Sequence, residues 1–295
     1  MPYVLKTYDV VVGQKVEDFL VDVVQLSETL AHKLLKNARI LDHKKKTLQK
    51  GKVLKSGYVE VLVFEPMSKG LKPLFETEHF ALFDKPSGLL VHPTIRSTEY
   101  TLLDEVRYLF GDEAKLVHRI DAETSGLVLV SKNGYANYLL KEMFAEKKFV
   151  KKYKALVEDE FKEEMLIEVG ISPSKGLIKL KMQTSEKGKE SSTRIHPLAY
   201  DKVKNQTLVE AIPYTGRQHQ IRVHLESVGH RIVGDPIYGL EESFVDDFLN
   251  DKVENSKRVK TTGASRLMLH AYYLAFTFLG TRYVFCSKQT LGDMD

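Results

Sequence analysis

Residues 117–130 read VHRIDAETSGLVLV, a polar segment that leads directly into the apolar run 126–130. The apolar run predicts a strand, and the polar residues predict a turn that places Asp121 at the edge of this strand. A carboxylate in that position, with Arg119 two residues earlier, can face a cleft as a nucleophile or a base. The alternative is that Asp121 accepts hydrogen bonds from the turn amides around Thr124, which is the commoner role of aspartate in turns.

Further strand-like runs occur on both sides of this segment, at 80–83, 153–157, 177–182 and 207–212. Helical spacing occurs at 101–109, 135–145 and 217–228, the last followed by Gly229 in the usual position for ending a helix. Strands outnumber helices and do not alternate regularly with them. We therefore predict an α+β fold with a mainly antiparallel, mixed sheet instead of a doubly wound parallel sheet.

The first 66 residues predict a separate small α/β unit. Residues 16–24 have helical spacing, Ser27 can cap a second helix that continues to about residue 37, and 58–64 alternates like a strand. One face of the second helix is expected to carry Leu30, Leu34 and Ala38, and another the basic residues His32, Lys33, Lys36 and Arg39. Residues 66–72 are typical of a linker, so we expect domains at 1–66 and 67–295.

The composition excludes several classes of protein. The chain has 295 residues, with 44 Lys and Arg against 40 Asp and Glu, and a net charge of +4. A single cysteine, Cys286, excludes an internal disulfide framework and a cysteine-rich metal site. No apolar run approaches the roughly 18 residues that span a bilayer, and the N-terminus lacks the apolar core of a signal peptide. We therefore expect a cytoplasmic protein with no membrane partner.

Charge is distributed unevenly along the chain. Basic residues gather at 32–55, 141–154 and 175–194, whereas 240–256 is acidic. Any one basic run is more typical of a solvated surface than of a binding site. Three such runs together favour an anionic polymer as partner. We expect them to line one side around Asp121, with the acidic stretch away from it or at its rim.

The segment GRQHQIRVH at 216–224 contains two histidines, His219 and His224. On a helix, a separation of five residues turns them about 140° apart, so they cannot bind one ion. Arg217 and Arg222 would also repel a cation, and we predict no metal site. Two arginines near the start of a helix suit a phosphate or a partner carboxylate. The chain has no phosphate-binding glycine loop, which argues against nucleotide hydrolysis.

Six motifs occur in an order that resembles the RluA-type family of pseudouridine synthases. They are DKPSGLLVHP (84–93), HRIDAETSGL (118–127), KYKALV (152–157), GRQHQIRVHL (216–225), GHRIVGDPIYG (229–239) and LHA (269–271). Together they cover about residues 80–275. Ile120 and Gln218 replace residues that are more usual in the family, and neither needs to touch the chemistry.

The resemblance implies an enzyme that detaches uracil from its ribose, turns the base over and rejoins it through carbon 5, without cofactor or metal. Asp121 would be the catalytic aspartate, Arg222 the buried arginine that pairs with it, and Tyr153 the tyrosine whose ring stacks on the target base. Arg119 matches the arginine associated with base flipping. The other substrate-binding residues that the resemblance implies are Lys152, Arg217, His219 and Gln220.

The N-terminal unit resembles the small RNA-binding module of a ribosomal small-subunit protein. The match rests on position and length more than on residue identity, because Lys and His replace part of the expected arginines and Asp42-His43-Lys44 replaces the usual turn. The RNA-binding residues of this module would be Lys33, Lys36 and Arg39. The alternative is an extension that packs on the catalytic domain.

Taken together, we expect a monomeric RNA pseudouridine synthase that acts on large-subunit ribosomal RNA, with transfer RNA as the alternative substrate. A second hypothesis is a catalytically idle RNA-binding protein of the same fold. The presence of Asp121, Tyr153 and Arg222 argues against it. A third is a sugar-cleaving hydrolase that uses Asp121 with Glu123 as the second carboxylate.

Overall fold

A computed structural model of the chain describes residues 3–55, 57–93, 99–289 and 291. The chain forms two compact units, Met1–Lys69 with Pro93–Tyr100, and Gly70–His92 with Thr101–Asp295. The domain boundary expected at residue 66 stays a prediction. None of the described helices combines the length and the apolar character that a membrane span requires.

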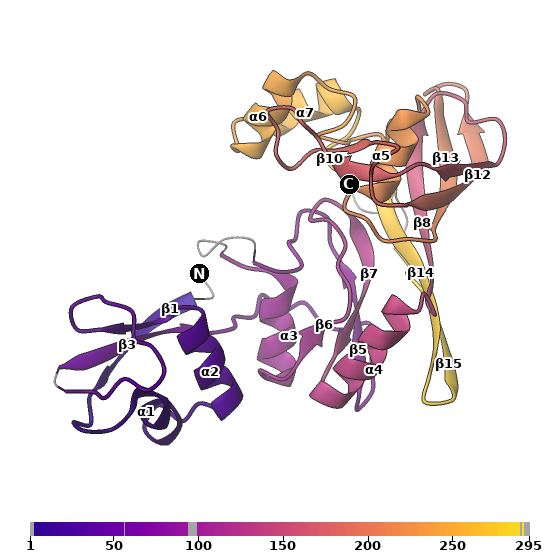
Figure 1. Ribbon diagram of the computed structural model, residues 1–295. Helices are drawn as coiled ribbons and strands as arrows, with labels where there is room; N and C mark the ends of the chain where they lie inside the picture. The colour runs from indigo at the N-terminus through magenta and orange to yellow at the C-terminus, as the bar shows by residue number, and fades with distance from the viewer. Residues whose placement is uncertain (1–2, 56, 94–98, 290, 292–295) are drawn as a thin grey trace. The chain divides into compact units, whose positions relative to one another are not determined.

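The first unit is a three-stranded antiparallel sheet with two helices (Figure 1). The strand order is β1 (Tyr3–Asp9), β3 (Tyr58–Phe64), β2 (Ile40–Asp42), and the helices are α1 (Val16–Asp22) and α2 (Glu28–Lys36). As predicted, Ser27 caps α2, because its Oγ accepts a hydrogen bond from the Leu30 amide at 3.3 Å. Side chains of both helices and of β3, among them Phe19, Leu34 and Val61, form one buried core.

The second helix is too short to include all the residues that were predicted on its faces. The helix ends at Lys36, and Ala38 has a left-handed backbone conformation with φ of 53°. Ala38 and Arg39 therefore lie in the connection to β2, while Lys33 and Lys36 are exposed on the helix itself. This turn is closed by the Arg39 amide, which donates to the Leu34 carbonyl at 2.9 Å.

The second unit is built on a ten-stranded mixed sheet. Its main path runs β4 (Phe75–Glu76), β5 (Phe80–Lys85), β7 (Ser125–Ser131), β14 (Leu269–Phe278), β8 (Val150–Glu158), β13 (Gln206–Pro213), β12 (Ser192–Asp201), β9 (Met165–Glu168). Two further strands join it, β15 (Thr281–Cys286) beside β14 and β6 (Lys115–Leu116) beside β7. Among the described strand pairs only β7 with β14 is parallel, which confirms the α+β fold.

Three helices cover this sheet (Figure 1). The α3 helix (Leu102–Phe110) packs on Val128 and Val130 of β7, whereas α4 (Gly134–Ala145) packs on Leu127 and Leu129. Because side chains alternate along a strand, α3 and α4 lie on opposite faces of β7. The third helix, α5 (Gln220–Ser227), contributes Ile221 and Leu225 to a core that it shares with β8 and β13.

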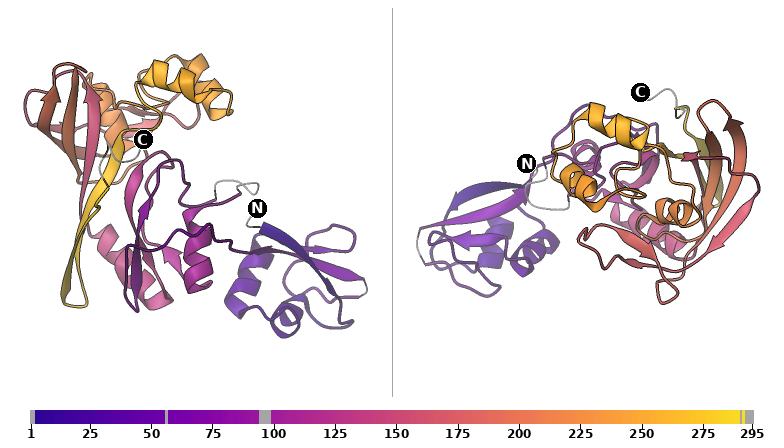
Figure 2. Two further views of the ribbon diagram at one scale, coloured as in Figure 1. Left: turned by 180° about the vertical axis from the view of Figure 1, so that it is seen from behind. Right: turned by 90° about the horizontal axis from the view of Figure 1, so that it is seen from above.

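Two segments of the second unit differ from the sequence-based predictions, and for a third the sequence predicted no helix or strand. The run 177–182 is not a strand but mostly a loop between β10 (Ile171–Pro173) and β11 (Met182–Thr184), and Leu177 is 82% exposed there. The helix expected at 217–228 begins only at Gln220, because His219 has φ of 56°. The acidic stretch 240–256 contains α6 (Glu242–Leu249) and the start of α7 (Asn255–Thr262), which Figure 2 shows from two further sides.

Candidate functional site

Asp121 lies in the turn between β6 and β7. The turn is closed by the main chain, because the Thr124 amide donates to the Asp121 carbonyl oxygen at 3.2 Å. The Asp121 carboxylate has other neighbours: its Oδ2 accepts from Arg222 Nη1 at 3.3 Å and lies 3.9 Å from His219 Nε2. The side chain is 27% exposed, so the carboxylate is held from inside the protein and remains open to a ligand.

Arg222, on α5, is 2% exposed and is held by a second aspartate. Its Nε and Nη2 donate to the two oxygens of Asp235 at 2.7 and 2.8 Å, which leaves Nη1 for Asp121. Burial alone would lower the pKa of Arg222, but the charges of Asp235 and Asp121 raise it above its usual range. Arg222 is therefore a permanent cation that connects the two aspartates.

Asp235 reaches Arg222 from a tight turn. Its Oδ1 also accepts from the amides of Ile237 and Tyr238 at 2.9 and 3.2 Å. Burial would raise the pKa of Asp235, but Arg222 and these amides lower it, so this carboxylate stays ionised. The turn requires Gly234, because its φ is +77° and a Cβ there would lie 1.7 Å from the Arg266 carbonyl oxygen.

His219 approaches Asp121 from the residue that precedes α5. The ring is buried, and its Nδ1 lies 2.8 Å from the Tyr238 hydroxyl, whose oxygen accepts from the Met182 amide at 3.0 Å. Tyr238 therefore has its own proton to donate to Nδ1, which assigns the neutral tautomer with Nε2–H toward Asp121. Burial and the nearby Arg222 lower the pKa of His219 to about 4, so the ring is neutral at neutral pH.

Tyr153 occupies the middle of β8 and packs against the core that α5 covers. Burial, and to a smaller extent the negative charge of Asp121, raise the pKa of its phenol well above the usual range. The structure thus brings together Asp121, Tyr153, His219 and Arg222, four of the residues that the sequence assigned to the site.

Lys152 is not brought to this group. Side chains alternate along β8, so Lys152 and Lys154 leave the face opposite to that of Lys151 and Tyr153. On that opposite face Lys152 Nζ forms an ion pair with Glu210 at 3.1 Å. The expected role of Lys152 in substrate binding therefore has no support in its position.

The other expected substrate-binding residues have mixed environments. Arg119 is exposed, two residues before Asp121. Arg217 is also exposed, and its Nε donates to the Glu190 carbonyl at 3.0 Å. Gln220 is buried, and both of its amide atoms have partners. Its Oε1 accepts from Thr215 and Arg217 in the turn before α5, and its Nε2 donates to Ser192 and Thr193 on β12. Gln220 thus stabilises this turn, and only the two arginines present free charge to a ligand.

Lys85 is a buried residue that the sequence analysis did not single out. Its Nζ donates to the Pro86 and Ala122 carbonyls, each at 2.8 Å, so the ammonium holds the residue next to Asp121. Burial lowers the pKa of Lys85 to about 7, although Glu123 and Asp121 raise it in part. Its position inside the first of the six motifs was the available signal, but a lysine in an Asp-Lys-Pro run does not reveal burial.

Glu123 also lies beside Asp121, and it has a partner on α7. Arg258 Nη2 donates to Glu123 Oε2 and, at 3.2 Å, to the Gly234 carbonyl, while the Phe248 ring lies 5.0 Å from the guanidinium. One arginine therefore connects the turn that carries Asp121 with the turn that carries Asp235. Because Glu123 is paired in this way, it is not placed as a second catalytic carboxylate.

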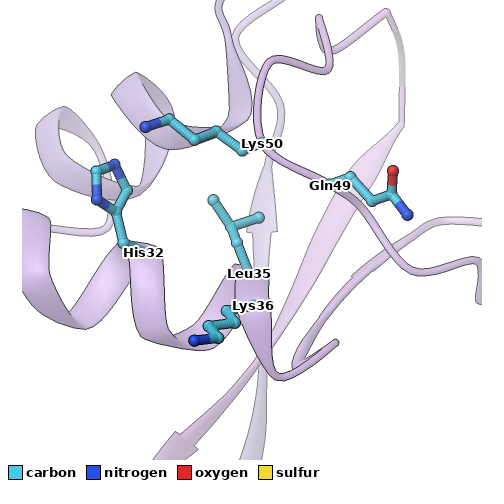
Figure 3. A pocket seen from close by; sticks show the side chains of 5 residues that line it. All are labelled: His32, Leu35, Lys36, Gln49 and Lys50. Carbon is cyan, nitrogen blue, oxygen red and sulfur yellow. The ribbon is translucent and has the colours of Figure 1, made fainter.

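The first unit has its own basic pocket, of about 460 Å³. It is lined by His32, Leu35, Lys36, Gln49 and Lys50. Figure 3 shows Leu35 between His32, Lys36 and Lys50, with the Gln49 amide pointing away from it. An apolar floor with cationic and amide groups at its edge suits a nucleotide, whose base is apolar on its faces and whose phosphate is anionic.

The residues at Asp121 provide a carboxylate aimed by a permanent cation, beside a neutral histidine and a neutral phenol. His219 and His224 contact different partners, Tyr238 and Thr193. Within the ranges that the structure describes, histidine, cysteine and carboxylate groups form no cluster suited to a metal ion. The arrangement can supply a negative charge, or a nucleophile, to a ligand that stacks on Tyr153.

Comparisons with known proteins agree on one family. Residues 79–227 match the family model described as RNA pseudouridylate synthase. An "Uncharacterized RNA pseudouridine synthase" of Helicobacter pylori (strain J99) is 35% identical, over 97% of this chain and 96% of that protein. A "Ribosomal large subunit pseudouridine synthase C" of Haemophilus influenzae is 30% identical, over 90% of this chain and 84% of that protein.

Another relative is a "Ribosomal large subunit pseudouridine synthase D" of Zymomonas mobilis, 31% identical over 72% of this chain and 66% of that protein. Among solved structures, "Human RNA Pseudouridylate Synthase Domain Containing 1" superposes with a TM-score of 0.60 at 26% identity. That match covers 77% of this chain and 86% of the human chain.

Proposed function

The chain belongs to the RNA pseudouridylate synthase family and is an RNA pseudouridine synthase, an isomerase. From this premise we propose that Asp121 is its catalytic residue. We also propose that its substrate is large-subunit ribosomal RNA. The observation that supports Asp121 is the chain of contacts from Asp235 through Arg222 to the Asp121 carboxylate. It holds one partly exposed carboxylate in a fixed direction beside Tyr153.

The reaction breaks the bond between ribose carbon 1′ and base nitrogen 1 and makes a bond from carbon 1′ to base carbon 5. The proton on carbon 5 leaves, and nitrogen 1 gains one, so atoms and electrons balance without a cofactor. An ionised Asp121 near carbon 1′ can stabilise or attack the sugar as the base departs. Tyr153, neutral because its pKa is raised, can stack on the base while it turns.

A uridine inside folded RNA reaches Asp121 only after it leaves the base stack, which costs a few kcal/mol. Arg119 is exposed and two residues from Asp121, so its guanidinium can occupy the vacated position or bind a phosphate. The exposed Arg217 supplies a second cation next to α5. His219 lies on the protein side of Asp121, with its Nε2 3.9 Å from the carboxylate.

Two observations support ribosomal RNA as the substrate. Relatives from Haemophilus influenzae and Zymomonas mobilis are named ribosomal large subunit pseudouridine synthases. The basic pocket of the first unit, with exposed Lys33 and Lys36 nearby on α2, gives that unit a surface for RNA, in line with the proposed RNA-binding module. Transfer RNA is the alternative substrate, and the mapping experiment includes it.

The test is to map pseudouridines in ribosomal and transfer RNA from cells with and without this chain, and then with Asp121→Asn. We expect a ribosomal site that disappears with the gene, returns with the wild-type chain and does not return with Asp121→Asn. Asp112→Asn, which changes an exposed aspartate, is the matched control and should restore the site. An active Asp121→Asn enzyme would contradict the catalytic role, and a site lost only from transfer RNA would contradict the substrate.

A further inference from the structure

The lysines of β8 differ in what surrounds them. Lys152 is paired with Glu210, and Lys154 lies 5.0 Å from the Tyr272 ring, on the face of the strand away from Asp121. Lys151 leaves the same face as Tyr153. In the part of the chain that the structure describes, its ammonium has neither a hydrogen bond nor a carboxylate partner, and its one described contact is the Phe144 ring at 5.4 Å.

Three segments of the catalytic unit surround the Lys151 ammonium. Phe144 lies at the end of α4, and its ring stacks on His118, three residues before Asp121. A Cβ on Gly216, in the turn before α5, would lie 3.8 Å from Lys151 Nζ. His118 provides no negative charge to balance the ammonium, because the ring is neutral. Burial together with the positive charge of Lys151 lowers the pKa of His118 to about 3. The ammonium is thus beside the segment that carries Asp121.

A half-buried ammonium without a counterion is unfavourable, and burial accordingly lowers the pKa of Lys151. An anion at this point would restore the lost solvation. RNA carries one phosphate per nucleotide, and an enzyme that extrudes one uridine must hold the backbone on both sides of it.

From this placement we propose that Lys151 binds a phosphate of the RNA backbone next to the uridine held at Asp121. Gly216, which has no side chain, leaves room for the phosphate beside the ammonium, and the Phe144 ring forms the apolar wall behind it. This assignment rests on the proposed function, because it takes the uridine to lie at Asp121. It also makes Lys151, and not Lys152, the lysine of this strand that touches substrate.

The test uses the full chain and an unmodified transcript of large-subunit ribosomal RNA. Single-turnover pseudouridine formation gives the maximal rate and the half-saturating concentration, and filter binding over a series of KCl concentrations gives the salt dependence of the dissociation constant. For Lys151→Met we expect half-saturation to rise about tenfold with the maximal rate within about twofold. The slope of log affinity against log salt should fall by about one, and Lys151→Arg should restore most of the affinity.

Lys154→Met is the matched control, because it removes the same charge from the other face of the same strand, and it should change neither quantity by more than about twofold. The proposal is overturned if Lys152→Met or Lys154→Met weakens binding as much as Lys151→Met does. It is also overturned if Lys151→Met lowers the maximal rate and leaves affinity and salt slope unchanged. If the wild-type chain forms no pseudouridine in this transcript, the substrate assignment fails, and the filter-binding comparison still decides the role of Lys151.

Discussion

Arg222 shows what one residue contributes to this site. Two of its nitrogens are used by Asp235, and the third is directed at Asp121, so the direction of the Asp121 carboxylate depends on a guanidinium that is itself fixed. A lysine has the same charge but no planar fork, and cannot make these contacts together.

Replacing Arg222 by Met should cost about 3–5 kcal/mol in the free energy of unfolding, because Asp235 would keep a buried charge without its partner. Arg222→Lys should recover part of that stability and little activity. Urea unfolding measures the first effect and single-turnover kinetics the second. Near wild-type activity in Arg222→Lys would show that the paired geometry is not needed.

Lys85 predicts a specific dependence of stability on pH. Its pKa is about 7 in the folded chain, whereas an unperturbed lysine has a pKa of 10.5, so between these limits the unfolded chain binds one more proton than the folded chain. Unfolding is then more costly at higher pH, and stability from this group rises from about pH 7 to about pH 10.

The measurement is urea unfolding of the wild-type chain and of Lys85→Met at several pH values in that window. The free energy of unfolding of the wild type, minus that of the variant, should increase by roughly a few kcal/mol as the pH rises through this window, because Met cannot titrate. A difference that stays constant with pH would mean that Lys85 keeps its proton when buried.

Among the elements, α7 links two parts of the candidate site. It begins at the end of the acidic stretch 240–256, for which the sequence indicated no purpose, and its Arg258 binds Glu123 and the Gly234 carbonyl. The helix therefore connects the two turns that hold Asp121 and Asp235. A role in positioning predicts an effect on rate and not on affinity, since Arg258 is not exposed to the RNA.

Arg258→Met should lower the single-turnover maximal rate on the order of tenfold and leave half-saturation within about twofold, because the Asp121 turn loses a charge-assisted contact. Lys257→Met, one residue earlier on the same helix, is the control and should keep the wild-type rate. Arg258→Lys should recover part of the rate. A loss of affinity without a loss of rate would assign Arg258 to RNA binding instead.

At the scale of the whole molecule, the candidate binding residues fall into two separate units. The second unit contains Asp121 and the residues that aim it, whereas the first carries a separate basic pocket lined by His32, Lys36 and Lys50. If the first unit docks RNA, charge reversal there should weaken binding without slowing the chemistry.

The double variant Lys36→Glu with Lys50→Glu should raise half-saturation about tenfold and reduce the salt slope by about two, at an unchanged maximal rate. Lys202→Glu with Lys204→Glu makes the same change of charge in the exposed turn between β12 and β13, and is expected to behave like the wild type. Equal losses in the two double variants would mean that only net charge matters.

Local patterns in the sequence were sufficient for much of the catalytic unit. The apolar run at 126–130 predicted a strand, the polar residues before it placed Asp121 in a turn at its edge, and the count of strands over helices predicted the α+β class. These features are local, because a strand or a turn is selected by neighbouring residues. Where a backbone takes an unusual conformation, as at His219, the local prediction was wrong by a few residues.

The tertiary structure decided most of the charge pairs. Glu123 and Arg258 are 135 residues apart, and Arg222 and Asp121 are 101 apart, so no local pattern relates them. The pairing of Arg222 with Asp121 was expected only from the family resemblance. The sequence analysis expected Lys152 to bind substrate. In the structure Lys152 leaves the other face of β8 from Tyr153 and pairs there with Glu210 of a neighbouring strand. Helices and strands follow from local propensity and periodicity. The partners of a buried or half-buried charge are instead set by the tertiary packing of segments that are distant in the sequence.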